Sequence, residues 1–263
     1  MSRIQATFAA LRASKAPGLI TYVTAGDPDA DTSVEILVAL AGAGADVLEV
    51  GVPFSDPLAD GPVIQRATER ALARGMTLRG TLDIVRRVRA EVATPIVLFT
   101  YANPVVRMDA ATFAREAAGA GVDGVLILDY PIEEAGPLRA TLLDSGLDPI
   151  FLISPTTTDA RIRRAAELGR GFLYLISRLG VTGARDQVAA DIEGLVTRVR
   201  AHSALPVALG FGISRPEHIA SVCAWADAAV VGSALVNVIA EHGASADVAD
   251  RAAEYIRWLK GRA

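Results

Sequence analysis

The chain has few of the side chains that carry covalent chemistry in enzymes. It contains one cysteine, Cys223, so no disulfide can form within the chain, and its apolar neighbours predict a small buried thiol rather than a nucleophile. The two lysines, Lys15 and Lys260, lie near the termini and outside any expected strand end. A Schiff-base aldolase or a pyridoxal-phosphate enzyme needs a lysine in its site, so both classes are set aside.

Histidine, long apolar runs and dense positive charge are also scarce. The three histidines lack metal-ligand spacing, so we expect no metal site at His202, His218 or His242. No apolar run reaches the roughly 18 residues that span a bilayer, and the N-terminus has no secretory core, so we expect a cytoplasmic protein. The net charge of −4 and the scattered arginines argue against nucleic-acid binding.

The chain instead alternates short apolar runs with longer helical stretches, the pattern of repeated βα units and a parallel sheet. Eight runs are predicted as strands, at residues 19–24, 47–50, 96–100, 124–128, 149–153, 172–176, 206–210 and 228–232. This number predicts an α/β fold of the TIM (β/α)8 barrel type, with a single domain over residues 1–263. A doubly wound open sheet is the alternative, but no G-x-G-x-x-G follows the first strand.

Extra helices are expected after the second strand, at 63–74 and 78–92, and near the C-terminus, at 247–260. A short motif ends the helix before three of the strands, at residues 43–46, 120–123 and 224–227, and we interpret it as structural. Each copy closes with an aspartate: Asp46, Asp123 and Asp227.

Two carboxylates flank a rigid turn after the second strand. Glu49 interrupts the apolar strand on the same face as Val47, where an ionised carboxylate costs several kcal/mol unless it is paired or protonated. Asp60 precedes Gly61 and Pro62, and Pro62 marks the first turn of a helix. Asp60 is therefore either a helix cap or part of a site.

A phosphate site is predicted after strands seven and eight. Small residues at Gly212, Gly232 and Ser233 let backbone N–H groups approach an anion, and a helix beginning near Ser233 directs its positive end to the same point. Gly183, in a segment expected to form a mobile lid, adds a further N–H. Tight turns without a ligand are the structural alternative.

The remaining groups at the strand tops are carboxylates and phenols, which favour metal-free proton transfer. Besides Glu49 and Asp60 they are Tyr101, Asp129 and Tyr174. Asp27, in the turn after the first strand, is expected to organise that turn.

Taken together, residues 48–67 and several short motifs resemble the tryptophan synthase alpha subunit over essentially the whole chain. The supporting motifs lie at residues 24–28, 101–104, 129–131, 177–183, 210–212 and 232–233. The resemblance implies a TIM barrel that cleaves indole-3-glycerol phosphate to indole and glyceraldehyde 3-phosphate. It also implies no cofactor in this chain and a beta subunit that carries pyridoxal phosphate, in an alpha2beta2 heterotetramer that passes indole through a tunnel.

The resemblance assigns roles to residues at matching positions. Glu49 is the expected general acid and base, and Asp60 the expected acceptor of the indole N–H, with Tyr174 and Thr182 in support. The other assignments are an indole pocket of Tyr22, Ile64, Thr100, Leu126 and Asp129, phosphate contacts at Gly183, Phe211, Gly212, Gly232 and Ser233, and a partner interface at Pro53, Phe54 and Asp56. Phe172 and Tyr22 depart from the tyrosine and phenylalanine that are familiar at their positions.

Three other functions stay open at this point. A free-standing indole-releasing lyase would use the same residues without a partner. A non-catalytic barrel that binds the phosphate ligand would only regulate another protein, although it has no need of a buried acid. A different phosphate-binding barrel enzyme, such as an epimerase or indole-glycerol-phosphate synthase, is the third, and the latter would need a strand-end lysine.

Overall fold

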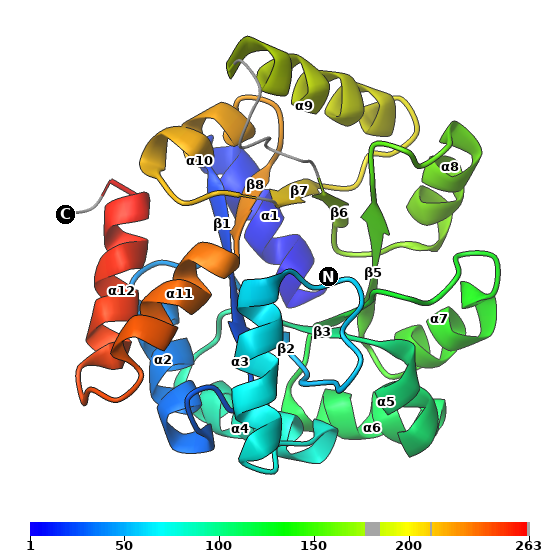
Figure 1. Ribbon diagram of the computed structural model, residues 1–263. Helices are drawn as coiled ribbons and strands as arrows, with labels where there is room; N and C mark the ends of the chain where they lie inside the picture. Colours follow the sequence, from blue (N-terminus) through cyan, green and yellow to red (C-terminus); the bar gives the residue numbers. More distant parts are fainter. Residues whose placement is uncertain (177–184, 211, 262–263) are drawn as a thin grey trace.

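Eight parallel strands close into a barrel in sequence order, each paired with its neighbours and β8 paired with β1 (Figure 1). The computed structural model describes residues 1–176, 185–210 and 212–261. The strands are β1 Gly18–Thr24, β2 Val47–Gly51, β3 Ile96–Thr100, β4 Gly124–Ile127, β5 Asp148–Ile153, β6 Leu173–Ile176, β7 Val207–Gly210 and β8 Ala228–Val231. The prediction of a TIM barrel is confirmed, and every predicted strand end lies within one residue of the observed one.

Helices cover the outside of the barrel. They are α1 Arg3–Ser14, α2 Ala30–Gly42, α3 Pro62–Ala73, α4 Leu78–Glu91, α5 Ala102–Met108, α6 Ala110–Ala120, α7 Ala135–Asp144, α8 Asp159–Leu168, α9 Arg185–Arg200, α10 Pro216–Cys223, α11 Ser233–His242 and α12 Val248–Leu259. The extra helices expected after the second strand and at the C-terminus are α3, α4 and α12. None of the helices in the described part of the chain combines the length and apolar character needed to cross a bilayer.

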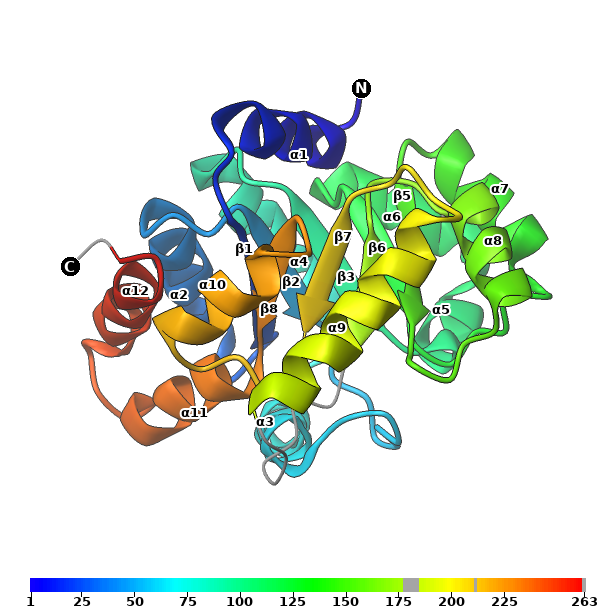
Figure 2. The ribbon, with the colours of Figure 1, turned by 90° about the horizontal axis from the view of Figure 1, so that it is seen from above.

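Two apolar layers form because both faces of each strand are covered. The outer layer packs the strands against the helices. The inner layer fills the barrel and receives two residues of α1, Ile4 and Phe8, with the Phe8 ring 5.5 Å from that of Phe172. Helix α1 therefore closes one end of the barrel, and α3 lies at the opposite end (Figure 2).

The three aspartates of the repeated motif each join two neighbouring elements at the α1 end. Each carboxylate accepts a backbone N–H of an earlier strand at 2.8 Å, and its own backbone N–H donates to the carbonyl of that same residue at 2.8 Å. The pairs are Asp46 with Leu19, Asp123 with Ile96, and Asp227 with Val207. The structural interpretation of this motif is confirmed.

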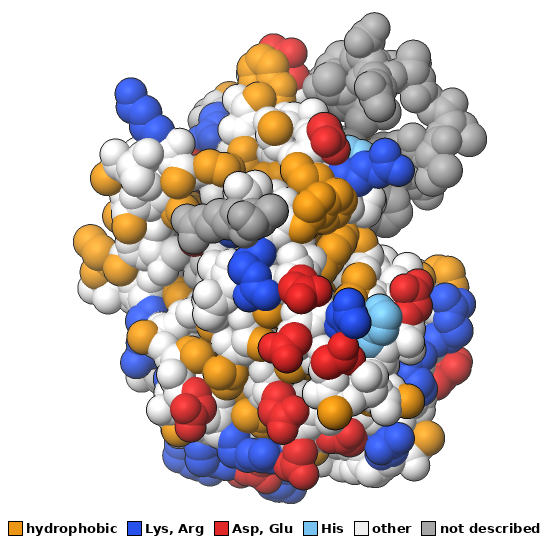
Figure 3. Space-filling view, turned by 90° about the vertical axis from the view of Figure 1, so that its left-hand side faces the viewer, with side chains coloured by type: hydrophobic (Ala, Val, Ile, Leu, Met, Phe, Trp, Pro, Cys, Tyr) orange, Lys and Arg blue, Asp and Glu red, His pale blue; other side chains and the backbone are white. Residues whose placement is uncertain are grey.

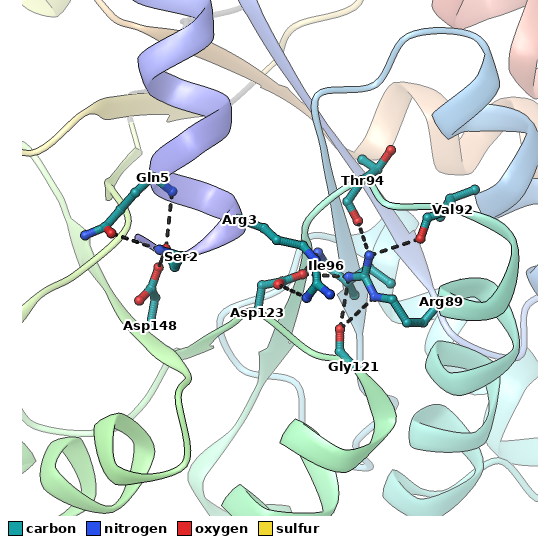
Figure 4. A network of polar contacts seen from close by, with 10 residues as sticks. All are labelled: Ser2, Arg3, Gln5, Arg89, Val92, Thr94, Ile96, Gly121, Asp123 and Asp148. Carbon is teal, nitrogen blue, oxygen red and sulfur yellow. Dashed lines mark hydrogen bonds and ion pairs between the residues drawn. The ribbon is translucent and has the colours of Figure 1, made fainter.

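Cations complete this end of the barrel. Asp123 binds Arg89 at 2.6 Å and Arg3 at 2.9 Å, and Ser2 just before α1 donates to Asp148 (Figure 4). Asp148 also lies 3.0 Å from Arg170. Elsewhere charges of both signs are intermixed, as the surface on the side of α11 and α12 shows (Figure 3).

Candidate active site

Glu49 points into the barrel from the middle of β2. It lies in register with Tyr22 of β1 and Val97 of β3, and it is 1% exposed. Neither of its carboxylate oxygens has a hydrogen-bond partner among the described residues. Burial first, and the nearby charge of Asp60 second, raise the pKa of Glu49 to about 8. Glu49 is therefore mostly protonated at neutral pH and can both give and accept a proton.

Asp60 lies in the connection between β2 and α3. Helix α3 begins at Pro62 with Gly61 as its N-cap, so Asp60 stands one residue too early to cap it, and the helix-cap alternative is wrong. The backbone of Asp60 is held by bonds from its N–H to the Pro57 carbonyl at 3.0 Å and from Gln65 Nε2 to its carbonyl at 2.9 Å. Burial raises the pKa of Asp60 to about 6, although the nearby Tyr101 hydroxyl acts in the opposite direction.

The interior above Glu49 is lined by apolar and phenolic side chains. Leu126 and Tyr174 lie in the inner layer, and Tyr22 belongs to a second buried cluster against which Ile64 of α3 packs. Burial raises the pKa of both tyrosines well above the ordinary value, and the charges of Asp60 and Glu49 add to this. The Tyr22 hydroxyl lies 3.3 Å from Thr24 Oγ1. These hydroxyls are thus neutral and act as hydrogen-bonding groups.

Gly51 makes room for Tyr22. A β-carbon at position 51 would lie 2.1 Å from the Tyr22 hydroxyl oxygen and 2.6 Å from the ring carbon that bears it. No side chain fits there, so the close approach of the two strand residues requires glycine.

Two predicted pocket residues do not face the interior. In β3, Val97 and Phe99 belong to the inner layer and Leu98 to the outer one, so the alternation of the strand turns Thr100 outward. Asp129 is exposed, and its carboxylate accepts the Ala102 N–H at 2.7 Å at the start of α5. Neither side chain therefore faces the interior, although the resemblance assigns both residues to the indole pocket.

Their neighbours take these places. Phe99 packs edge-on against Tyr22, with ring centroids 5.2 Å apart, and Leu128 and Leu152 also pack against the inner layer. The apolar character of these residues gave no signal in the sequence, because β3, β4 and β5 are apolar on both faces. Tyr101 was named as a strand-top phenol without a role, and the structure places its hydroxyl beside Asp60.

The predicted phosphate contacts lie in part outside the described residues. Helix α11 begins at Ser233 with Gly232 as its N-cap, as expected, and Gly212 has a φ of +73°, which favours glycine. The free N–H groups at the start of this ten-residue helix are suited to bind an anion. Phe211, Thr182 and Gly183 lie outside the described residues.

The predicted partner loop shows mixed exposure. Asp56 is exposed, Phe54 is partly buried, and Pro53 is buried, so the side chain of Pro53 is not presented at the surface. Leu58 is 94% exposed in the same loop.

Asp27, expected to organise its turn, also binds Arg70 of α3 through both oxygens, at 2.8 and 2.7 Å.

This arrangement supports proton transfer to a substrate held among apolar and phenolic side chains. Both Glu49 inside the barrel and Asp60 in the loop after β2 have raised pKa values, and this loop lies at the carboxyl ends of the strands, where TIM barrels hold their active sites. Over the described ranges, no group of three or more His, Cys, Asp and Glu side chains is placed to hold a metal ion.

Comparison with known proteins gives a consistent result. The family model described as tryptophan synthase alpha chain matches residues 8–260. The tryptophan synthase alpha chain of Burkholderia thailandensis is 50% identical over 261 residues, which cover 99% of this chain and 96% of that protein. Tryptophan synthase subunit alpha from Legionella pneumophila has a TM-score of 0.92 at 37% identity, covering 100% of this chain and 98% of that one. A chain of tryptophan synthase from M. tuberculosis, in an aminoacrylate-bound form, has a TM-score of 0.89 at 36% identity, covering 100% and 99%.

Proposed function

The chain belongs to the tryptophan synthase alpha chain family, lyases of tryptophan biosynthesis, and from this premise we propose how its residues cleave the substrate. The reaction breaks the bond between indole C3 and the glycerol phosphate of indole-3-glycerol phosphate. Its products are indole and glyceraldehyde 3-phosphate. The step needs one proton on C3 and removal of one proton from the adjacent hydroxyl group.

Glu49 serves as both acid and base. In its protonated form it gives its proton to indole C3, which produces an indolenine with a positively charged ring. The resulting carboxylate then takes the proton of the hydroxyl group. The oxygen electrons form the aldehyde, the carbon–carbon bond breaks, and its electron pair restores the aromatic ring. Glu49 ends the cycle protonated, as its pKa of about 8 favours.

Asp60 stabilises the charged intermediate. Its carboxylate accepts the indole N–H and so lies beside the positive charge that develops on the ring. With a pKa of about 6, it is largely ionised at neutral pH, whereas Glu49 is not. Two neighbouring acids thus hold opposite protonation states, which the two roles require.

The phosphate of the substrate binds at the start of α11, with Gly212, Gly232 and Ser233 in contact and Gly183 and Phe211 assigned by family position. Tyr22, Ile64 and Leu126 contact the indole, and Tyr174 and Thr182 support the acids.

Within the family this chain works with a beta subunit. We propose an alpha2beta2 heterotetramer in the cytoplasm, with pyridoxal phosphate in the beta subunit and a contact at Pro53, Phe54 and Asp56. This chain itself needs no cofactor.

The observation that carries the proposal is the Glu49 carboxyl inside the barrel, which has no hydrogen-bond partner among the described residues, since a buried acid of this kind lowers the stability of the fold and is typical of catalytic sites. The test is indole release by the wild type, Glu49→Gln and Asp60→Asn, each with and without a beta subunit. We expect a loss of about 10²–10⁴-fold for Glu49→Gln. Glu133→Gln, an exposed acid paired with Arg161, is the matched control.

Each outcome separates the alternatives. Low release alone that rises with the beta subunit supports the synthase, whereas high release alone supports a free-standing lyase. Undiminished release by Glu49→Gln contradicts the acid–base assignment. No release by the wild type with its partner present supports a regulatory barrel.

A further inference from the structure

Tyr101 holds the loop that carries Asp60 at two points. It follows β3 directly and is 4% exposed. Its hydroxyl oxygen accepts the Ala59 N–H at 3.1 Å, and its ring packs on Phe54 with centroids 5.1 Å apart. Ala59 and Phe54 both belong to the connection between β2 and α3. One side chain from β3 therefore ties this connection to the barrel wall.

The bond from Ala59 also orients the Tyr101 hydroxyl. A phenol that accepts a backbone N–H has a single proton left to donate. The next carboxylate along the chain is Asp60, and the nearby Tyr101 hydroxyl acts to lower the Asp60 pKa against the opposing effect of burial. Tyr101 thus favours the ionised form of Asp60.

The other two phenols of the site have different surroundings. The Tyr22 hydroxyl lies beside Thr24, and the Tyr174 hydroxyl lies beside Gly210, where a β-carbon would approach it to 2.8 Å. Both belong to strands of the barrel wall, whereas Asp60 belongs to a connecting loop. Of the described phenols, Tyr101 is the one that contacts this loop through its hydroxyl and its ring.

We propose that Tyr101 is the positioning residue for Asp60, fixing the carboxylate in place and in its ionised form to receive the N–H of an aromatic heterocycle. This inference rests on the proposed function. A fixed acceptor matters because a misplacement of about 1 Å at a reacting group lowers rates by about 10²-fold. Tyr101 touches Asp60 and acts through it, without contact with the reacting atoms.

The test is a double-mutant cycle with pH profiles. Indole release is measured between pH 5.5 and 9 for the wild type, Tyr101→Phe, Asp60→Asn and the double variant, in the presence of a beta subunit. We expect Tyr101→Phe to lower kcat/KM about tenfold, the size of one lost hydrogen bond to a charged group. Since its loss raises the Asp60 pKa, the acidic limb of the profile should move to higher pH. In the Asp60→Asn background, Tyr101→Phe should add no further loss.

Two controls keep the result decisive. Tyr130→Phe removes a hydroxyl from another partly buried tyrosine, after β4, and should change neither rate nor profile. Difluorotyrosine at position 101 keeps the hydroxyl and should retain activity even if Tyr101→Phe folds poorly. An unmoved acidic limb, or an equal loss in both backgrounds, overturns the proposal. If the wild type itself releases no indole, the proposed function fails instead.

Discussion

Asp227 at the α1 end of the barrel and the two acids of the candidate site show opposite balances between burial and binding partners. At the α1 end, burial acts to raise the pKa of Asp227, but bonds from the Val207 N–H and Arg12 outweigh it and hold the pKa below its ordinary value. At the other end burial prevails, and the pKa values of Glu49 and Asp60 are raised. The difference is one of partners: acids with cations and N–H groups stabilise the fold, and acids without them are available for chemistry.

The largest expected effect on stability comes from removing a paired acid at the α1 end. Asp123→Ala leaves Arg89, whose side chain is 14% exposed, without its carboxylate and Ile96 without its acceptor. We expect the free energy of unfolding to fall by about 3 kcal/mol, as for a broken buried ion pair. Urea unfolding measures it, and Glu133→Ala, from an exposed pair, should change it by less than about 0.5 kcal/mol. Equal effects would refute the distinction.

Removing the buried Glu49 carboxyl should have the opposite effect and raise the free energy of unfolding. The folded chain keeps the Glu49 proton up to about pH 8, whereas the unfolded chain releases it above its ordinary pKa of 4.5. The folded state thus binds more protons in this window, so wild-type stability falls as pH rises through it. Glu49→Gln lacks this loss. Its free energy of unfolding relative to the wild type should therefore increase by about 3 kcal/mol from pH 5 to pH 8. Urea unfolding at several pH values tests this; a difference independent of pH would contradict it.

Among the three motif aspartates at the α1 end, the loss of stability on substitution should be smaller where the side chain is more exposed. The side chains of Asp123, Asp227 and Asp46 are 5%, 11% and 21% exposed, so screening by water increases in that order. We expect substitution by asparagine to destabilise the fold least at Asp46, by about 1 kcal/mol, because the amide oxygen can still accept the Leu19 N–H. Thermal unfolding of the three variants measures the order. A reversed order would mean that burial does not set the strength of these pairs.

The smallest expected effect is a change in the pKa of Glu49 when the charge of Asp60 is removed. Asp60→Asn removes the charge that contributes second to the raised pKa of Glu49. The pKa of Glu49 should therefore fall, yet stay above its ordinary value, since burial is the larger cause. A carbon-13 NMR titration of the Glu49 carboxyl group follows this directly. An unchanged titration would show that the acids do not interact.

The barrel and the position of Glu49 could be predicted because they depend on local patterns. Apolar runs fix the strands, and alternation from Val47 fixes the face of Glu49. The resemblance assigns Thr100 and Asp129 to the pocket, but alternation alone does not tell which face of a strand lies inside the barrel when both faces are apolar. Phe99 and Leu128 are found only by knowing that side.

The cation partners could not be predicted for a different reason. Asp46 binds Lys260 and Asp227 binds Arg12, residues more than 200 positions apart along the chain. No local pattern links such pairs, because closure of the barrel brings them together. The same applies to Tyr101, whose role depends on a loop some 40 residues earlier.

Gly51 and Tyr22 restrict how this pocket can diverge among descendants. Because the space of a β-carbon at position 51 is taken by the tyrosine hydroxyl and also by its ring carbons at 2.6 and 2.8 Å, even phenylalanine at position 22 leaves too little room. An alanine at position 51 can be tolerated only after the aromatic side chain at position 22 has been lost. The two positions are therefore epistatic, and the order in which they mutate decides which lineages keep a folded enzyme.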